Sequence, residues 1–414
     1  MEPRALDEWD LLALEATVDL HADTPLHNLT LEGNGHPGFA MRAWMGLMKA
    51  LGVLFPRLRN FTRQVTLSSL AVDGRGLQVF CAVTRGLPPF YRSSHTLYTR
   101  GVARWRRGSV DTALNAWVAQ AAWVYREVAA HPERLVLTPD FASAAAAMGA
   151  GKVAVQLGIE GAFPFDPTEL DVGALRAFLP ALGAEFPRPT EAELQAPGGL
   201  LRYARRLGVQ YLSLNHLASS CFAGSDLRPN SKRGAGISES GRRLVKQAEE
   251  AGIMLDLAHA SQRAQQDAVE LVARGGYRLP LLVSHARVAL AGEPLHWRMT
   301  RASVLEAVQM TGGIIGVMGA RRFLPHGDSP DPRVVIRDIA DQVDCVRARI
   351  GVDFVGLGLD ADGFVGLPFA TSAEVAAVLK IELRARGYSE AELLKIYGGN
   401  YLHVLRRAEH PAHG

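Results

Sequence analysis

The stretch VDLHADTP, residues 18–25, places ionisable side chains at alternate positions of a short apolar run. Asp19, His21 and Asp23 would lie on one face of a β-strand, because alternate side chains of a strand point to the same side. Burying such a face costs free energy unless something compensates the polar groups, and a metal cation is the usual partner of a His/Asp cluster. The run therefore predicts a strand that delivers metal ligands, with further ligands supplied from elsewhere in the chain.

Similar short runs, rich in apolar and β-branched residues, recur along the chain at residues 76–83, 152–161, 209–217, 253–261, 280–288, 313–320 and 353–362. Many intervening stretches repeat apolar residues at helical spacing, namely 111–130, 240–251, 262–274, 302–310, 332–350 and 372–387. Alternating strands and helices indicate an α/β fold with a parallel sheet. About eight such units predict a (β/α)8 TIM-type barrel, whose active site lies at the carboxyl ends of the strands. A doubly wound sheet is the alternative.

The chain contains no repeat, low-complexity tract or Gly/Ser linker that would divide it, so residues 1–414 are predicted to form a single barrel domain with insertions. One added segment, GFAMRAWMGLMKALGVLFPRLRN at 38–60, is expected to be helical. Its methionines, including Met41, Met45 and Met48, fall along one face. Packing on the barrel is one interpretation of this face, and a lid or a homodimer contact is the other.

The bulk composition indicates a soluble globular protein. Hydrophobic residues make up 48% and charged residues 21%, and the net charge of +3 is too balanced to indicate nucleic-acid binding. Three widely spaced cysteines predict neither a disulfide framework nor a cysteine-based zinc site. The start, MEPRALDEWDLLALE, lacks the order of a signal peptide, and no run reaches the roughly 18 apolar residues of a membrane span. We therefore expect a cytoplasmic protein.

Polar residues end most of the predicted strands: His21 and Asp23, Glu160, His216, His259, His285 and Asp360. A barrel collects metal ligands and catalytic groups at these ends. His21, Asp23, Glu160, His259 and His285 are enough ligands for two metal ions. Asp362 shares a face with Asp360 and competes for its role, whereas Asp19 lies deeper and is expected to be structural or to orient a ligand.

These residues resemble the membrane (renal) dipeptidases, zinc peptidases of the amidohydrolase-like barrel superfamily. HADTP resembles the family's His-x-Asp metal motif, GIEG its bridging glutamate, and SLNH its substrate-facing histidine. DLAH and VSHA resemble its later histidine ligands, and GLDADG resembles its catalytic aspartate segment. The tail RGYSEAELLKIYGGNYLHVLR, 386–406, is similar to the family's closing segment, so the resemblance runs in order from about residue 17 to 406.

The resemblance implies a role for each residue. His21, Asp23 and Glu160 would hold one zinc ion, and Glu160, His259 and His285 would hold the other. His216 would contact the scissile carbonyl oxygen, Arg298 would bind the substrate's terminal carboxylate, and Asp360 would transfer the proton. The family usually has asparagine directly after that arginine, where this chain has Met299.

The expected function is therefore that of a binuclear zinc dipeptidase, which uses metal-activated water to hydrolyse dipeptides that carry a free C-terminal carboxylate. One alternative is a hydrolase of the same superfamily that acts on an N-acyl amino acid, a lactam or a lactone. The other is a non-catalytic metal- or peptide-binding protein.

Overall fold

The computed structural model describes residues 17–22, 75–83, 112–226, 235–290, 293, 298–361, 368–369 and 372–410. The predictions for Asp23, Asp362 and the segment at 38–60 lie outside these residues. The backbone of His21 is described, but its side chain is not. The prediction of a single domain over residues 1–414 therefore stays a prediction.

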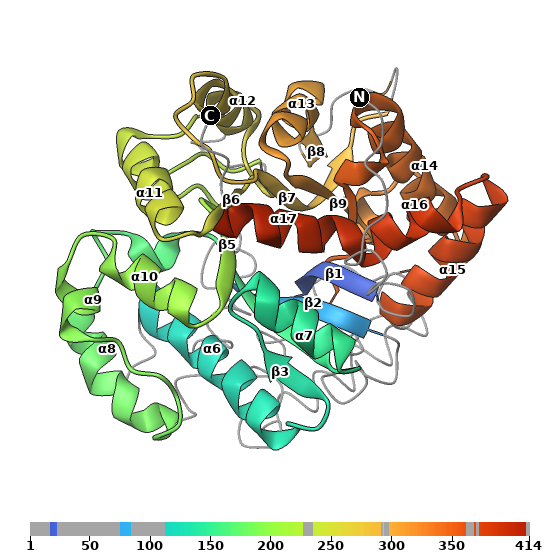
Figure 1. Ribbon diagram of the computed structural model, residues 1–414. Coiled ribbons are helices and arrows are strands. Elements are labelled where there is room, and N and C mark those ends of the chain that lie inside the picture. Colours follow the sequence, from blue (N-terminus) through green and yellow to red (C-terminus); the bar gives the residue numbers. More distant parts are fainter. Residues whose placement is uncertain are drawn as a thin grey trace.

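In the described part of the chain, eight parallel strands form a closed ring (Figure 1). The strands are β1 (Thr17–Ala22), β2 (Arg75–Val83), β4 (Val153–Glu160), β5 (Val209–Ser213), β6 (Met254–Asp256), β7 (Leu282–Val288), β9 (Ile314–Met318) and β10 (Val355–Gly358). Their order is β2-β1-β10-β9-β7-β6-β5-β4, and pairing of β2 with β4 closes the ring. Each predicted run supplies one strand, which confirms the (β/α)8 barrel. Ring closure rules out the doubly wound sheet.

Helices surround the strands in Figure 1. The longer ones are α6 (Ala113–Ala130), α7 (Phe141–Gly149), α10 (Gly199–Arg206), α11 (Glu239–Glu250), α12 (Gln262–Ala273), α13 (Ala302–Thr311), α14 (Pro332–Ile350), α15 (Ser372–Ala385) and α17 (Asn400–Glu409). Shorter helices are α8 (Val172–Phe178), α9 (Glu191–Gln195) and α16 (Glu390–Leu394). The predicted helices match α6, α11, α12, α13, α14 and α15 within two residues at each end. No helix in the described ranges is both long and apolar enough to span a membrane.

Two short strands were not predicted from the sequence. β3 (Leu135–Leu137) pairs with the start of β4, and β8 (Met299–Thr300) pairs with the end of β7. Both are too short to show a period-two pattern, so only their pairing in the folded chain identifies them.

Local sequence explains how the segment after β6 becomes a loop followed by a helix. The Ser261 hydroxyl accepts a hydrogen bond from the Ala264 backbone amide at 3.0 Å and so caps the start of α12. The same hydroxyl donates to the Ala235 carbonyl oxygen at 2.6 Å. An N-cap of this kind contributes about 1 kcal/mol. It fixes the chain two residues after His259.

Two glycines allow the strands to approach β7 closely. A Cβ atom at Gly316 of β9 would lie 1.9 Å from the Ser284 carbonyl oxygen, and one at Gly358 of β10 would lie 1.8 Å from the same atom. Both distances are far below van der Waals contact. Only glycine therefore fits at these two positions beside Ser284 and His285 of β7.

We expect Gly358→Ala to lower the free energy of unfolding by at least about 1–3 kcal/mol, because β10 must move away from β7. Thermal unfolding followed by circular dichroism measures this change. Gly173→Ala in α8 is the control, since its nearest neighbour would be a side-chain oxygen of Asp171 at 3.2 Å. Equal changes in melting temperature for the two variants would contradict the close-approach argument.

Candidate active site

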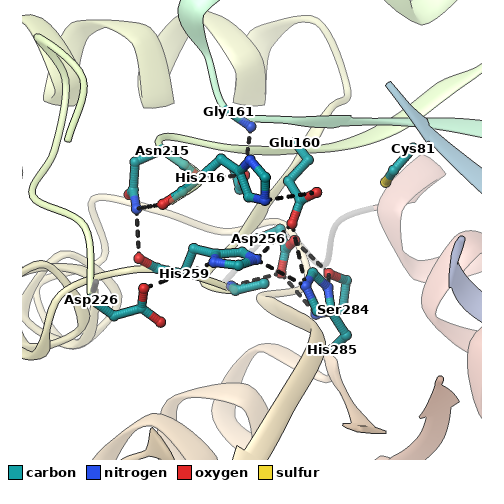
Figure 2. Close-up of polar contacts among 12 residues, drawn as sticks. Cys81, Glu160, Gly161, Asn215, His216, Asp226, Asp256, His259, Ser284 and His285 are labelled. Atoms are coloured by element: carbon teal, nitrogen blue, oxygen red, sulfur yellow. Dashed lines mark hydrogen bonds and ion pairs between the residues drawn. The ribbon is translucent and has the colours of Figure 1, made fainter. Parts of the chain in front are cut away.

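Four of the predicted site residues lie in or just after strands of the barrel. Glu160 is the last residue of β4, and His285 lies within β7. His216 and His259 follow β5 and β6, each three residues beyond the strand's end. Figure 2 shows the carboxylate of Glu160 with the imidazoles of these three histidines around it.

The contacts among these four side chains are short. Glu160 Oε1 lies 2.8 Å from His259 Nε2 and 3.3 Å from His285 Nε2. Glu160 Oε2 lies 3.6 Å from His216 Nε2. The two ring nitrogens His259 Nε2 and His285 Nε2 are 3.1 Å apart. One carboxylate thus gathers three imidazole nitrogens that come from three different strand ends.

The electrostatics of this cluster favour a positive charge. The Glu160 side chain is only 2% exposed, so its carboxylate needs compensation. Burial and the nearby Arg298 guanidinium lower the pKa of His259, but the Glu160 and Asp226 carboxylates outweigh them and raise it overall. Buried imidazole nitrogens and a carboxylate oxygen at these spacings are the donors that zinc and similar divalent ions prefer. The residues therefore fit a metal ion.

Two of the predicted site residues have an uncommon backbone conformation. His259 has φ 62° and Asp360 has φ 60°, in the left-handed region that non-glycine residues rarely adopt. Such a conformation costs about 1–3 kcal/mol and persists where neighbouring structure holds it. At His259, the carbonyl oxygen accepts from Asn215 Nδ2 at 2.6 Å and from the Asp226 backbone amide at 3.0 Å.

Asp360 follows β10 at the same end of the barrel. The bridge between Ala22 and Ala361 places it beside the end of β1, which carries His21. The buried Asp19 carboxylate accepts a hydrogen bond from the Leu359 backbone amide at 3.1 Å. Asp19 therefore ties β1 to the turn that carries Asp360.

Arg298 lies directly beside the histidine cluster. Its side chain is 1% exposed, and its Nη2 atom is 2.8 Å from His259 Nε2. Nη1 lies 3.6 Å from Asp226 Oδ2, and the guanidinium carbon lies 5.7 Å from the centre of the Phe323 ring. Met299, which replaces the family's usual asparagine, is buried in β8.

Four polar residues in or beside the cluster were not predicted from the sequence: Asn215, Asp226, Asp256 and Ser284. Each lies within three residues of a strand end or of a predicted ligand, apart from Asp226, which lies in the irregular segment after β5. Their proximity to His216, His259 and His285 in the sequence was the available signal. Asp226 had no local signal, because acidic residues in loops are usually solvated.

The later part of the chain matches a protein-family model. Residues 191–414, more than half of the chain, match the model of the membrane dipeptidases, peptidase family M19. The chain belongs to this family. The matched range contains His216, His259, His285, Arg298 and Asp360, whereas Glu160 precedes it.

Curated relatives cover a similar share of the chain. Dipeptidase tcpJ of Claviceps purpurea is 32% identical over 224 residues, which are 52% of this chain and 49% of that protein. Dipeptidase verJ of Clonostachys rogersoniana is 30% identical over 213 residues, which are 51% of each protein. The chain therefore spans about half the length of the curated relatives it matches.

Solved structures share the fold at low sequence identity. A metallo peptidase from Rhodobacter sphaeroides, liganded with a phosphinate mimic of the dipeptide L-Ala-D-Ala, has a TM-score of 0.63 at 20% identity. That match covers 95% of this chain and 99% of the other. An amidohydrolase from Pseudomonas aeruginosa has a TM-score of 0.58 at 16% identity, with coverage of 97% and 99%. These likenesses support the barrel fold of the family.

We expect Asn215→Ala to weaken divalent-metal binding about 10-fold or more and to destabilise the protein by about 1–3 kcal/mol. The reason is that the Asn215 amide holds the left-handed backbone of His259. Metal retained after dialysis against a chelator and the melting temperature measure the two effects.

Gln309→Ala is the matched control for this variant, because Gln309 Nε2 of α13 also donates to a backbone carbonyl oxygen, that of Ile350 in α14 at 2.8 Å. It should cost stability without changing metal retention. Identical metal retention in Asn215→Ala and the wild-type protein would mean that Asn215 does not position His259.

Proposed function

We propose that the protein is a binuclear zinc dipeptidase that hydrolyses dipeptides with a free C-terminal carboxylate. The observation that carries this proposal is the buried Glu160 carboxylate, with the Nε2 atoms of His259 and His285 at 2.8 and 3.3 Å, in a chain of the membrane dipeptidase family. A cytoplasmic location and a homodimer remain predictions from the sequence.

The proposed ligands form two groups that share Glu160. Glu160, His259 and His285 would hold one zinc ion, and His21 and Asp23 with Glu160 would hold the other. The backbone of β1 supports the second group, because the Tyr211 hydroxyl donates to the Leu20 carbonyl oxygen at 2.7 Å and so fixes the residue before His21. When bound, the metal supplies Lewis-acid chemistry and makes a hydrolytic water available near neutral pH.

The chain's own residues would share the remaining work of hydrolysis. The His216 imidazole, next to Glu160, would stabilise the negative charge that develops on the carbonyl oxygen. Asp360 would accept a proton from the attacking water and pass it to the leaving nitrogen as the C–N bond breaks. The products are two amino acids, one with the new carboxylate and one with the new amine.

Arg298 would select the substrate's free carboxylate. Its planar guanidinium matches a carboxylate with two parallel hydrogen bonds, and its burial strengthens a charge-assisted contact. Phe323 and Asp226 hold the group beside His259. A carboxylate bound by Arg298 would lie close to the proposed metal ligands, which favours short substrates such as dipeptides.

We expect Asp360→Asn to lower kcat by about 10²-fold or more, because the amide cannot accept the water's proton. Metal content should stay at the wild-type level. Asp341→Asn, which alters a surface ion pair with Arg386, is the control and should retain wild-type turnover. Near-normal kcat in Asp360→Asn would move the proton-transfer role to another residue such as Asp362.

We expect Arg298→Ala to reduce kcat/KM for dipeptides about 10- to 150-fold, the loss expected for a charge-assisted hydrogen bond of about 1.5–3 kcal/mol. The wild-type enzyme should cleave C-terminal dipeptide amides poorly, and the variant should lower that rate little further. The measurement compares L-Ala-L-Ala with its C-terminal amide, with metal content determined in parallel.

Equal losses on both substrates would give Arg298 a structural role. Efficient cleavage of the amide by the unmodified enzyme would overturn the dipeptidase proposal. An N-acyl amino acid, a lactam and a lactone in the same panel identify the alternative hydrolase if one of them is the better substrate.

A further inference from the structure

Behind His285 lies a chain of buried polar groups that the proposed reaction does not use. Ser284 Oγ is 2.9 Å from His285 Nδ1 and 2.6 Å from Asp256 Oδ2 (Figure 2). All three residues are buried, and they bring together the end of β6 and the middle of β7. The contacts run along a line from Asp256 through Ser284 to the imidazole.

Hydrogen-bond directions along this line follow from the donors available. Asp256 Oδ1 accepts from the backbone amides of Ser284 at 2.8 Å and Ala258 at 3.1 Å. Two backbone donors favour the ionised form of this carboxylate, which has no proton to donate, so the Ser284 hydroxyl donates to Asp256 Oδ2. The single hydroxyl proton is then used, and Ser284 Oγ can only accept from His285.

His285 must therefore carry its proton on Nδ1. A neutral imidazole with a proton on Nδ1 has a lone pair on Nε2. Nε2 is the atom that lies 3.3 Å from Glu160 Oε1 and 3.1 Å from His259 Nε2, inside the cluster. The hydrogen-bond chain thus selects the tautomer that can bind a metal ion.

We propose that Asp256 and Ser284 are positioning residues that hold His285 as the Nδ1–H tautomer and so present its Nε2 lone pair to a divalent cation. The inference rests on the metal centre of the proposed function. The tight packing of β9 and β10 against the Ser284 carbonyl oxygen, which Gly316 and Gly358 permit, fixes the hydroxyl's position. His259 has a looser partner, since its Nδ1 atom lies 3.8 Å from Asp226 Oδ1.

Asp256→Asn tests the direction of these hydrogen bonds, because asparagine has nearly the same shape as aspartate. The asparagine oxygen would still accept from the two backbone amides, which leaves its NH2 group facing Ser284 Oγ. Ser284 would then accept from the amide and donate to His285 Nδ1. The proton of His285 would move to Nε2, where it blocks the lone pair that faces Glu160.

The tautomer itself is the first readout. Nitrogen-15 NMR of the metal-free protein, with histidine labelled, distinguishes a proton on Nδ1 from one on Nε2, and His285→Gln assigns the signal. We expect Nδ1–H in the wild-type protein and Nε2–H in Asp256→Asn. Nδ1–H in both proteins would overturn the inference, because a merely structural role for Asp256 leaves the tautomer unchanged.

Zinc affinity is the second readout, measured by competition with a chromophoric chelator. Loss of a residue that supports a metal ligand usually costs about 10- to 100-fold in affinity, and we expect this loss at one zinc equivalent in both Ser284→Ala and Asp256→Asn. The double variant Ser284→Ala/Asp256→Asn should bind zinc as Ser284→Ala does, because it has no hydroxyl whose hydrogen-bond direction the asparagine could reverse. Thr311→Val is the control, since it removes a buried hydroxyl that accepts from the Leu281 amide at 3.0 Å, before the start of β7.

The outcomes separate the two proposals. Wild-type affinity in Ser284→Ala and Asp256→Asn would overturn the positioning role while leaving the metal centre intact. Failure of the wild-type protein to bind zinc would overturn the metal centre, and the tautomer measurement would still decide the direction of the hydrogen-bond chain. If Ser284→Ala does not fold, Asp256→Asn and its NMR signal test the inference alone.

Discussion

The buried carboxylate of Glu160 is the constraint on which the rest of this structure depends. A carboxylate that is 2% exposed is unfavourable unless cations or hydrogen-bond donors surround it. Here the imidazoles of His216, His259 and His285 surround it, and the proposed metal ion between them would compensate its charge. They follow or lie in β5, β6 and β7, and a closed parallel ring is the architecture that brings these strand ends to one point.

The cluster is surrounded by residues that hold its histidines in position. Asn215 and the Asp226 backbone hold the carbonyl of His259, whose own backbone is in the left-handed region. Ser284 contacts Nδ1 of the His285 ring, and Asp256 in turn accepts a hydrogen bond from Ser284. Supporting hydrogen bonds of this kind orient metal ligands, and losing one typically costs about 10- to 100-fold in metal affinity. The positions of the proposed ligands therefore depend on residues outside the cluster as well.

A proposed metal ligand, His259, is in direct contact with the proposed substrate-binding residue, Arg298. Arg298 Nη2 lies 2.8 Å from His259 Nε2, and Asp226 lies near both side chains. Any change in the charge of His259 therefore changes its electrostatic interaction energy with the guanidinium, because the two groups are in contact in a buried environment of low dielectric constant. In the proposed function, recognition of an anionic substrate end and binding of a cation would be linked through this contact.

Local sequence patterns predicted the strands of the barrel, most of its helices and the four residues of the Glu160 cluster. Runs such as KVAVQLGIEG and VSHARV encode buried strands locally, and Glu160 and His285 stand out in them because ionisable residues are rarely buried. Closure of the ring is visible only in the tertiary structure. It depends on the pairing of β2 with β4, although β3 lies between them in the sequence. The tertiary structure also decided the tasks of Asn215 and Asp256, which depend on partners 44 and 28 residues away. Periodicity reports which face of an element is buried, but a hydrogen bond between distant residues exists only once the backbone has brought them together.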